Sequence, residues 1–284
     1  MIKKKIILDG AMGTELERLG VSLTLPIWSA DANLAHPDIV KKIHQNYIAE
    51  GVDIITTNTF RTTTWTYRLA GYTPANAKER AKNSFFKAVE CAHGASQGSV
   101  SIAGSVTSIE DCYLPEKFPG RGLSQDIYGE IIEWFNDTDI DIILFETMGN
   151  IEEIEIAMQM SQKANKKVWL SIIMKDGDHL LDGTPVQNFF KVLNKFKIDC
   201  LLNNCNQVGK TIASLKNIKS GWKGMWGVYP NLGLIDYGND YFQTLDDDNF
   251  KSDMASILSL EPNVVGICCG STPGHISTLK SIIN

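Results

Sequence analysis

The sequence predicts a single (β/α)8 barrel of the TIM type, and three observations support this fold class. Short β-branched segments recur eight times along the 284 residues, and each is followed by a helical pattern. Several of the segments are almost wholly apolar, which is typical of parallel strands buried on both faces. One α/β barrel commonly uses 200–250 residues or more. We therefore expect residues 1–284 to form one barrel domain, with a doubly wound open sheet as the alternative.

The expected strands are short and apolar. They cover residues 6–8, 53–58, 100–106, 141–146, 168–174, 199–205, 225–229 and 263–268. The helical patterns cover residues 37–49, 74–93, 125–136, 151–164, 185–196, 210–218, 248–260 and 273–283. In the first of these helices Ile39, Ile43 and Tyr47 have helical spacing, and Gly51 follows as a stop signal. Pro273 suits the first turn of the last helix, because an N–H is not needed there.

The composition excludes several classes of protein. The chain is 43% hydrophobic and 21% charged, with a mean hydropathy of -0.10, so it is neither disordered nor collagen-like. Its net charge of -6 provides no basic surface for a phosphate backbone, and we expect no nucleic-acid partner. No segment has the roughly 18 apolar residues of a membrane span, and the N-terminus lacks the apolar core of a signal peptide. We expect a cytoplasmic protein with no membrane partner, and the sequence leaves the oligomeric state open.

Polar side chains follow the expected strands at their carboxyl ends. They are Asp9, Asn58, Glu146, Asn204, Cys205, Cys268 and Cys269. In barrels of this type the chemistry lies at the C-terminal ends of the strands. We therefore expect these residues, which are distant in sequence, to meet at one mouth of the barrel.

Three thiols at these strand ends indicate a metal site. Cys205, Cys268 and Cys269 form the set of three thiolates that can bind zinc and leave a fourth position open. Neighbouring residues of a regular strand face opposite sides, so Cys268 and Cys269 can both ligate only if the strand breaks there. Gly270 and the residues after it can supply that break. The alternative is that these cysteines are buried and inert, which is the interpretation we give to Cys91, Cys112 and Cys200. Without an export signal we expect no disulfide framework among the six.

A ligand set made only of sulfur limits the kinds of reaction that the predicted zinc site could catalyse. None of the five histidines ends an expected strand, whereas hydrolytic zinc sites usually use histidine and carboxylate ligands. Soft ligands favour a thiol substrate at the open position, which zinc would hold as a nucleophilic thiolate.

Five segments resemble the homocysteine S-methyltransferase family, whose members use S-methylmethionine or betaine or form the homocysteine domain of methionine synthase. The segments are residues 8–14 (LDGAMGT), 55–60 (ITTNTF), 145–148 (FETM), 204–205 (NC) and 268–276 (CCGSTPGHI). The resemblance extends from about residue 6 to the C-terminus. It implies a homocysteine-binding barrel in which zinc, held by three cysteines, activates homocysteine for methylation to methionine.

The resemblance also implies roles for particular residues. It makes Cys205, Cys268 and Cys269 the zinc ligands, and Asp9, Gly10, Ala11 and Glu146 the binding site for the amino-acid part of homocysteine. Carboxylates suit an ammonium group, and backbone N–H groups suit a carboxylate. Asn58 is a further candidate for substrate binding, although an asparagine in this position can also cap a helix.

The sequence identifies the methyl donor less closely than it identifies the acceptor. Gly266-Ile267 replaces the Gly-Gly that usually precedes the Cys-Cys pair, and residues 105–113 replace a Gly-Pro turn that many members have. A dinucleotide-type glycine loop is absent from the sequence, which favours a small methyl cation: S-methylmethionine first, adenosylmethionine second and betaine third. Trp28, Trp65, Tyr67 and Tyr113 are the aromatic residues expected near the mouth that could attract such a cation. The alternatives are another thiol acceptor, a corrinoid partner protein, a metal-dependent hydrolase, or a non-catalytic barrel with structural zinc.

Overall fold

A ring of eight parallel strands forms the centre of the protein in the computed structural model, which describes residues 4–236, 241–244 and 246–283. The strands are β1 (Ile6–Ile7), β2 (Ile54–Thr56), β3 (Ser101–Thr107), β4 (Ile142–Met148), β5 (Lys167–Ile172), β6 (Cys200–Gln207), β7 (Met225–Asn231) and β10 (Val264–Val265). They pair in the order β1-β10-β7-β6-β5-β4-β3-β2, and every pair is parallel. A parallel bridge between Leu8 and Ile54 joins the two end strands and closes the ring. The predicted TIM-type barrel is confirmed, and the open sheet is excluded.

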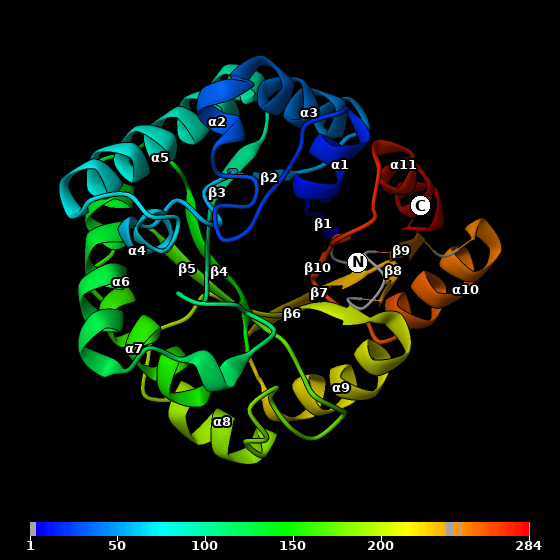
Figure 1. Cartoon of the computed structure of the whole chain (residues 1–284). Helices are drawn as coiled ribbons and strands as arrows, with labels where there is room; N and C mark the ends of the chain where they lie inside the picture. Colours follow the sequence, from blue (N-terminus) through cyan, green and yellow to red (C-terminus); the bar gives the residue numbers. More distant parts are fainter. Residues whose placement is uncertain (1–3, 237–240, 245, 284) are drawn as a thin grey trace.

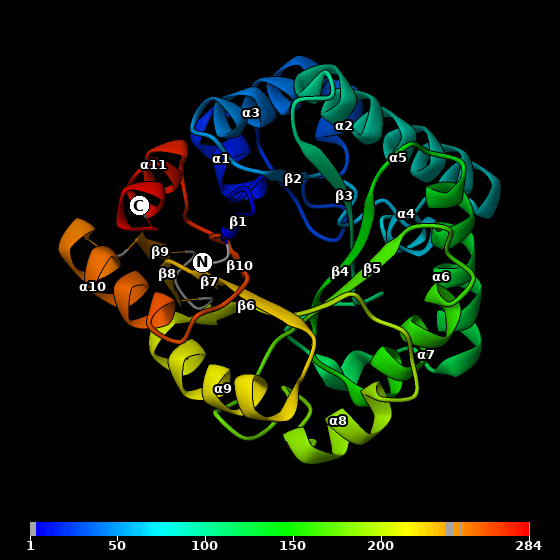
Figure 2. The same ribbon diagram turned by 180° about the vertical axis from the view of Figure 1, so that it is seen from behind.

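Helices form an outer ring around the strands, as the two opposite views of Figures 1 and 2 show. The main helices are α3 (Pro37–Ala49), α5 (Pro74–Ser96), α6 (Arg121–Asn136), α7 (Ile151–Ser161), α8 (Val186–Leu193), α9 (Val208–Gly221), α10 (Asp247–Leu258) and α11 (Pro273–Ile283). Each corresponds to one predicted helix, with ends that differ by a few residues. Over the ranges that the structure covers, no helix combines the length and the apolar character needed to cross a bilayer.

Several short elements were not predicted. They are α1 (Gly13–Arg18), α2 (Ala32–Ala35), α4 (Thr64–Leu69), the 3-10 turn Pro115–Lys117, and the antiparallel hairpin of β8 (Gly233–Asp236) and β9 (Tyr241–Thr244). Helices this short do not form from local propensity alone, so they leave no clear periodic pattern in the sequence. All of them lie in connections that follow the carboxyl ends of strands β1, β2, β3 and β7. These connections form the mouth of the barrel.

The barrel interior is built from every second residue of the strands. Its apolar layer consists of Leu8, Ile54, Ala103, Ile142, Leu144, Trp169, Cys200, Leu202, Tyr229 and Val264. Side chains of a strand alternate between its two faces, so positions two residues further along face the same interior. In five strands these positions hold polar residues, namely Thr56, Ser105, Glu146, Ser171 and Asn204. The strand period therefore places a polar layer at the carboxyl end of the barrel.

Gly227 allows two strands to approach closely within this interior. It lies on β7 opposite Val264 of β10. A Cβ atom at this position would overlap the Val264 carbonyl oxygen and lie 2.6 Å from Cδ2 of Leu202. A side chain here would force the barrel wall apart.

We expect Gly227→Ala to lower the free energy of unfolding by about 1–3 kcal/mol, because a methyl group overpacks a filled interior. Gly122→Ala is the matched control, since Gly122 lies exposed on α6 and a Cβ there would contact nothing within 4 Å. That control should be neutral or stabilising by up to about 1 kcal/mol. Urea denaturation followed by circular dichroism measures both changes. Equal stability of the two variants would contradict the close packing at Gly227.

Candidate active site

A cavity of about 250 Å³ opens at the carboxyl ends of the strands. The residues predicted for the site all line it, although they come from five different strand ends. They are Asp9, Gly10, Ala11, Asn58, Glu146, Cys205, Cys268 and Cys269. The expectation that these residues would meet at one mouth is confirmed.

Two strands are distorted where they reach the cavity. The pairing of β4 with β5 shifts register between Phe145 and Met148, and that of β6 with β7 shifts between Asn204 and Gln207. Within these irregular stretches Thr147 has φ +58° and Cys205 has φ +54°. Left-handed backbone is uncommon for residues other than glycine, and such bulges change the direction in which side chains point.

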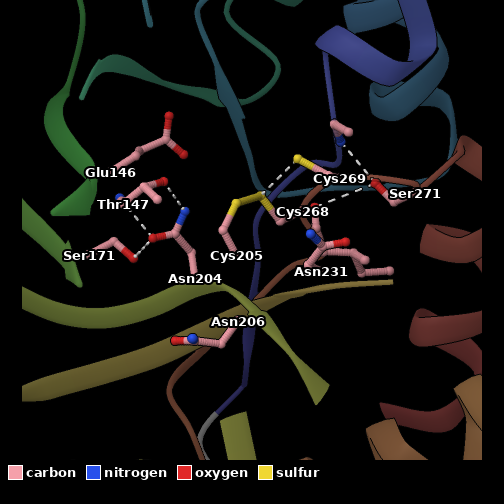
Figure 3. The surroundings of a disulfide bond; sticks show 12 residues. Glu146, Thr147, Ser171, Asn204, Cys205, Asn206, Asn231, Cys268, Cys269 and Ser271 are labelled. Atoms are coloured by element: carbon pink, nitrogen blue, oxygen red, sulfur yellow. Dashed lines mark hydrogen bonds between the residues drawn. A yellow bond between two sulfur atoms is a disulfide. The ribbon is translucent and has the colours of Figure 1, made fainter. Parts of the chain in front are cut away.

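The Asn204 side chain joins the two distorted strand ends. Its Oδ1 accepts hydrogen bonds from the Thr147 N–H, at 2.9 Å, and from Ser171 Oγ, at 2.7 Å. Its Nδ2 donates to Thr147 Oγ1 at 2.9 Å. Figure 3 shows Asn204 between Thr147 and Ser171, with Cys205 next to it and Glu146 above Thr147. One amide thus holds the strand ends that carry both the carboxylate and the first thiol.

The three predicted thiols form one sulfur cluster, defined as Cys205, Cys268 and Cys269. Their Sγ atoms all lie within 4.8 Å of one another, and those of Cys268 and Cys269 are 3.9 Å apart. β10 ends before Cys268, and Gly270 follows with φ +82°, so the predicted break of the strand is confirmed. The structure joins Cys205 to Cys268 in a disulfide, with Cα atoms 5.8 Å apart, whereas metal binding requires both as thiolates.

The sulfur cluster fits a zinc ion once the disulfide is reduced. Zinc binds thiolate sulfur at about 2.3 Å in a tetrahedron, which places sulfur atoms roughly 3.8 Å apart. The Cys268–Cys269 separation of 3.9 Å matches that spacing. Burial raises the pKa of the Cys269 thiol to about 12, so a cation is needed to make this thiol a thiolate at neutral pH.

The remaining three cysteines are separate from the cluster. Cys91 and Cys200 are buried in the hydrophobic core, as expected for cysteines that serve as small apolar residues. Cys112 is also buried, and burial raises its pKa to about 11. However, Cys112 lines the same cavity as the cluster, which its place in a long loop did not reveal.

Two carboxyl groups, from the ends of β1 and β4, line the cavity. Asp9 accepts hydrogen bonds from the Thr56 N–H and Thr56 Oγ1, both at 2.8 Å, and Glu146 accepts one from Ser105 Oγ. Burial raises the pKa of Asp9 well above its ordinary value, and the Thr56 bonds oppose that shift. Burial also raises the pKa of Glu146 to about 7, against the hydrogen bond from Ser105. A ligand cation between them would stabilise both carboxylates.

The turn after β1 brings backbone amides to the cavity. Gly10 is required there, because a Cβ would lie 2.5 Å from Ser271 Oγ and 2.7 Å from the Tyr47 ring. The Ala11 N–H donates to Ser271 Oγ at 2.9 Å, so a substrate carboxylate at Ala11 would compete with Ser271. Within the described ranges no acceptor is paired with the Gly10 N–H. Of the two amides, Gly10 is therefore the one available to a ligand.

Asn58 lies at the cavity wall, but its side chain already has several partners. Its Nδ2 donates to the Ser29 carbonyl and to Asn33 Oδ1, both at 2.8 Å, and its Oδ1 accepts from Ser29 Oγ at 2.6 Å. These bonds tie the end of β2 to α2. A direct contact between Asn58 and substrate stays a prediction.

The aromatic residues expected at the mouth divide into two pairs. Trp28 and Tyr113 line the cavity, as expected. Tyr67 is fully buried, with its hydroxyl donating to Asp31, and the Trp65 indole donates to Glu110 at 2.6 Å. These two residues belong to a connection at the mouth, as expected, but they do not line the cavity, because α4 turns them toward the surrounding loops and helices.

Several residues of the cavity wall were missed, and Phe60, Arg61 and Tyr229 are among them. Phe60 and Arg61 directly follow the Thr-Asn-Thr segment, so their place after a strand end was a usable signal. Tyr229 occupies an inward position of β7 and was hidden in an apolar strand. Its hydroxyl is buried beside Glu146 and Ser171, and burial raises its pKa well above the ordinary value.

Comparisons with known proteins agree with this architecture. The chain is 26% identical to a homocysteine S-methyltransferase of Escherichia coli, over 97% of this chain and 94% of the relative. The metallated crystal form of the homocysteine methyltransferase MmuM from Escherichia coli superposes with a TM-score of 0.85 over 98% of this chain and 96% of that one, at 24% identity. The oxidized form of the same enzyme superposes with a TM-score of 0.84 at 24% identity, over 98% and 95%. These superpositions show a shared fold.

A family model described as homocysteine S-methyltransferase matches residues 6–283, which is almost the whole chain. This protein is therefore a methyltransferase that belongs to the homocysteine S-methyltransferase family.

Proposed function

We propose that this enzyme transfers a methyl group from a small donor to the thiol of homocysteine, giving methionine, and that zinc is its cofactor. The observation that carries the proposal is the combination of a three-sulfur cluster and two carboxyl groups in one cavity. The sulfur cluster suits a thiol, and the carboxyl groups suit an ammonium group. Homocysteine carries both. We further propose that residues 1–284 act as one homocysteine-binding domain.

The amino-acid part of homocysteine would bind at the turn after β1 and across to β4. Asp9 and Glu146 would accept hydrogen bonds from the ammonium group, which would draw both carboxyl groups into their ionised forms. Gly10, with Ala11 after displacement of Ser271, would donate backbone hydrogen bonds to the carboxylate. Asn58 would contact substrate weakly and chiefly position the end of β2.

Cys205, Cys268 and Cys269 would hold the zinc ion. When bound by three thiolates, zinc supplies an open position that lowers the pKa of a substrate thiol and keeps the thiolate nucleophilic. The protein residues hold the homocysteine chain so that its sulfur faces the methyl donor. Holding both reactants at attack distance can contribute several kcal/mol to the rate.

The donor would be a small methyl cation, with S-methylmethionine first, adenosylmethionine second and betaine third. Trp28, Phe60 and Tyr113 line the cavity, and aromatic faces attract sulfonium and quaternary ammonium groups. The homocysteine sulfur attacks the methyl carbon in line, and the donor leaves as an uncharged thioether or amine. No covalent intermediate with the protein is needed. A corrinoid partner protein and another thiol acceptor are the alternatives that the experiments below distinguish.

The first prediction concerns the metal. Purified under reducing conditions, the protein should contain about one zinc ion per chain, and Cys268→Ser should lose most of it because one thiolate ligand is removed. Cys91→Ser is the matched control, since Cys91 is buried away from the sulfur cluster. Elemental analysis measures the zinc content. Full retention of zinc by Cys268→Ser would show that the cluster is not the metal site.

The second prediction concerns Glu146. Glu146→Gln should weaken homocysteine binding by about ten- to a hundredfold, the loss expected for a charge-assisted hydrogen bond. Calorimetric titration of the zinc-loaded protein measures this affinity. In the wild type the affinity should fall as the pH drops below about 7, because Glu146, with its pKa of about 7, becomes protonated. Glu79→Gln, at an exposed position of α5, should bind homocysteine like the wild type.

Glu146→Gln should weaken homocysteine binding but should raise the free energy of unfolding of the ligand-free protein. Because the pKa of Glu146 is higher in the folded protein than the ordinary 4.5, unfolding releases protons between about pH 4.5 and 7, and stability falls as the pH rises through that window. Glu146→Gln removes this cost. At pH 8 the ligand-free variant should be more stable by about 1–3 kcal/mol. If Glu146→Gln is less stable than the wild type at pH 8, the ionised Glu146 side chain stabilises the fold and this prediction is wrong.

The reaction itself is tested with isotope-labelled donors. Zinc-loaded protein and homocysteine should form labelled methionine with one small donor and no second protein, S-methylmethionine being the first choice. Glu79→Gln should retain this rate, and Cys268→Ser should lose it. Turnover only after addition of a methylated corrinoid protein would replace the small-donor proposal. Methylation of another thiol in preference to homocysteine would replace the acceptor.

A further inference from the structure

Arg61 is a buried cation in the wall of the active-site cavity. It lies in the connection between β2 and α4, is only 8% exposed, and lines the cavity together with Phe60. An arginine remains charged at any physiological pH and offers five N–H donors. Taking such a charge out of water is costly unless it is paired. The hydrogen-bond and ion-pair partners of Arg61 therefore indicate its role.

The protein itself satisfies only a small part of this guanidinium. Nη1 of Arg61 donates to the Glu110 carbonyl oxygen at 3.1 Å, and Cζ lies 5.9 Å from the centre of the Phe60 ring. Among the residues of known placement, no carboxylate lies within 4.0 Å of Arg61, whereas Arg18, Arg80 and Arg121 each have one. Arg61 is thus held at the cavity by one hydrogen bond to a backbone carbonyl. Its other N–H groups are available to a ligand that enters the cavity.

The surroundings of Arg61 differ from those of the proposed homocysteine site. Asp9 and Glu146, from β1 and β4, would attract the ammonium group of homocysteine, whose carboxylate would lie at Gly10. Arg61 instead adjoins the β3–α6 connection through its hydrogen bond to the Glu110 carbonyl oxygen, and Cys112 and Tyr113 of that connection line the same cavity. The guanidinium therefore lies on the side of the cavity that the β2 and β3 connections form.

We propose that Arg61 binds the carboxylate of the methyl donor. This inference rests on the proposed function, in which a methyl cation meets homocysteine in this cavity. It defines the donor as a zwitterion that combines a methylated sulfonium or ammonium group with a carboxylate. The aromatic side chains of Trp28 and Tyr113 would receive the cationic end, and Arg61, which lies against the Phe60 ring, the anionic end. During transfer the donor loses its methyl–sulfur or methyl–nitrogen bond and its positive charge, while the carboxylate remains unchanged on Arg61.

This arrangement predicts selectivity among donors of the same reactivity. S-methylmethionine and its carboxamide carry the same sulfonium group, but only the former has a carboxylate. A planar guanidinium can donate two parallel hydrogen bonds to a carboxylate, which a lysine ammonium cannot match. Arg61→Lys should therefore retain part of the preference, and Arg61→Gln should lose it.

The experiment compares wild type, Arg61→Gln, Arg61→Lys and Arg68→Gln as zinc-loaded proteins. Arg68 is exposed on α4 and provides the same change of charge outside the cavity. Binding of S-methylmethionine and of its carboxamide is measured calorimetrically without homocysteine, and KM for each donor is measured with homocysteine. Arg61→Gln should weaken S-methylmethionine binding by about ten- to a hundredfold and leave the carboxamide unchanged. The KM for homocysteine should not move.

The outcomes separate this inference from the proposed function. Methionine formation with an S-methylmethionine KM unaffected by Arg61→Gln would overturn the role of Arg61 and leave the function standing. A raised KM for homocysteine instead would assign Arg61 to the acceptor and overturn the inference. Donor binding that depends on Arg61, without methionine formation, would overturn the function and retain Arg61 as a carboxylate site. If betaine, adenosylmethionine and S-methylmethionine all fail to bind the wild type, the inference is wrong.

Discussion

The active site depends on the amide of Asn204, which couples two strand ends that are 57 residues apart in the chain. Through its bonds to Thr147 and Ser171 it holds β4, β5 and β6 in one arrangement at the mouth of the barrel. The backbone is left-handed at Thr147 and at Cys205. Such conformations persist only where contacts with the surrounding residues hold the backbone in place. The orientation of Glu146 and of the first thiol follows from this constraint.

The closure of the barrel provides the other half of the site. The first and last strands pair with each other, and the turns that follow them are joined by the bond from the Ala11 N–H to Ser271 Oγ and by that from the Gly270 N–H to Thr14 Oγ1. These contacts bring Cys268 and Cys269 next to Asp9 and Gly10, although more than 250 residues separate them in the sequence. Without a closed ring, the sulfur cluster and the turn at Asp9 and Gly10 would not share a cavity.

The buried charged groups of the cavity lower the stability of the ligand-free protein. Asp9 and Glu146 have raised pKa values because they are buried, and Arg61 is buried without a carboxylate partner among the described residues. Groups of this kind destabilise a protein until a ligand pairs with them. A zwitterionic amino acid, or a donor with both a cation and a carboxylate, would pair with these groups in a complementary way. The free energy of binding for such a ligand would come in part from groups that the fold leaves incompletely paired.

The eight strands, the eight main helices and the set of polar strand ends could be predicted from the residues alone, because these features depend on a local period of two or of 3.6 residues. The sequence also placed Cys205, Cys268 and Cys269 at the mouth, since the carboxyl ends of all the strands in a barrel meet there. The directions of several other side chains became visible only in the folded chain. Phe60, Arg61 and Tyr229 face the cavity, Trp65 and Tyr67 turn away from it, and Asn58 is hydrogen-bonded to Ser29 and Asn33. The direction of a side chain in a loop depends on contacts with segments far away in the sequence, and no local pattern encodes those contacts.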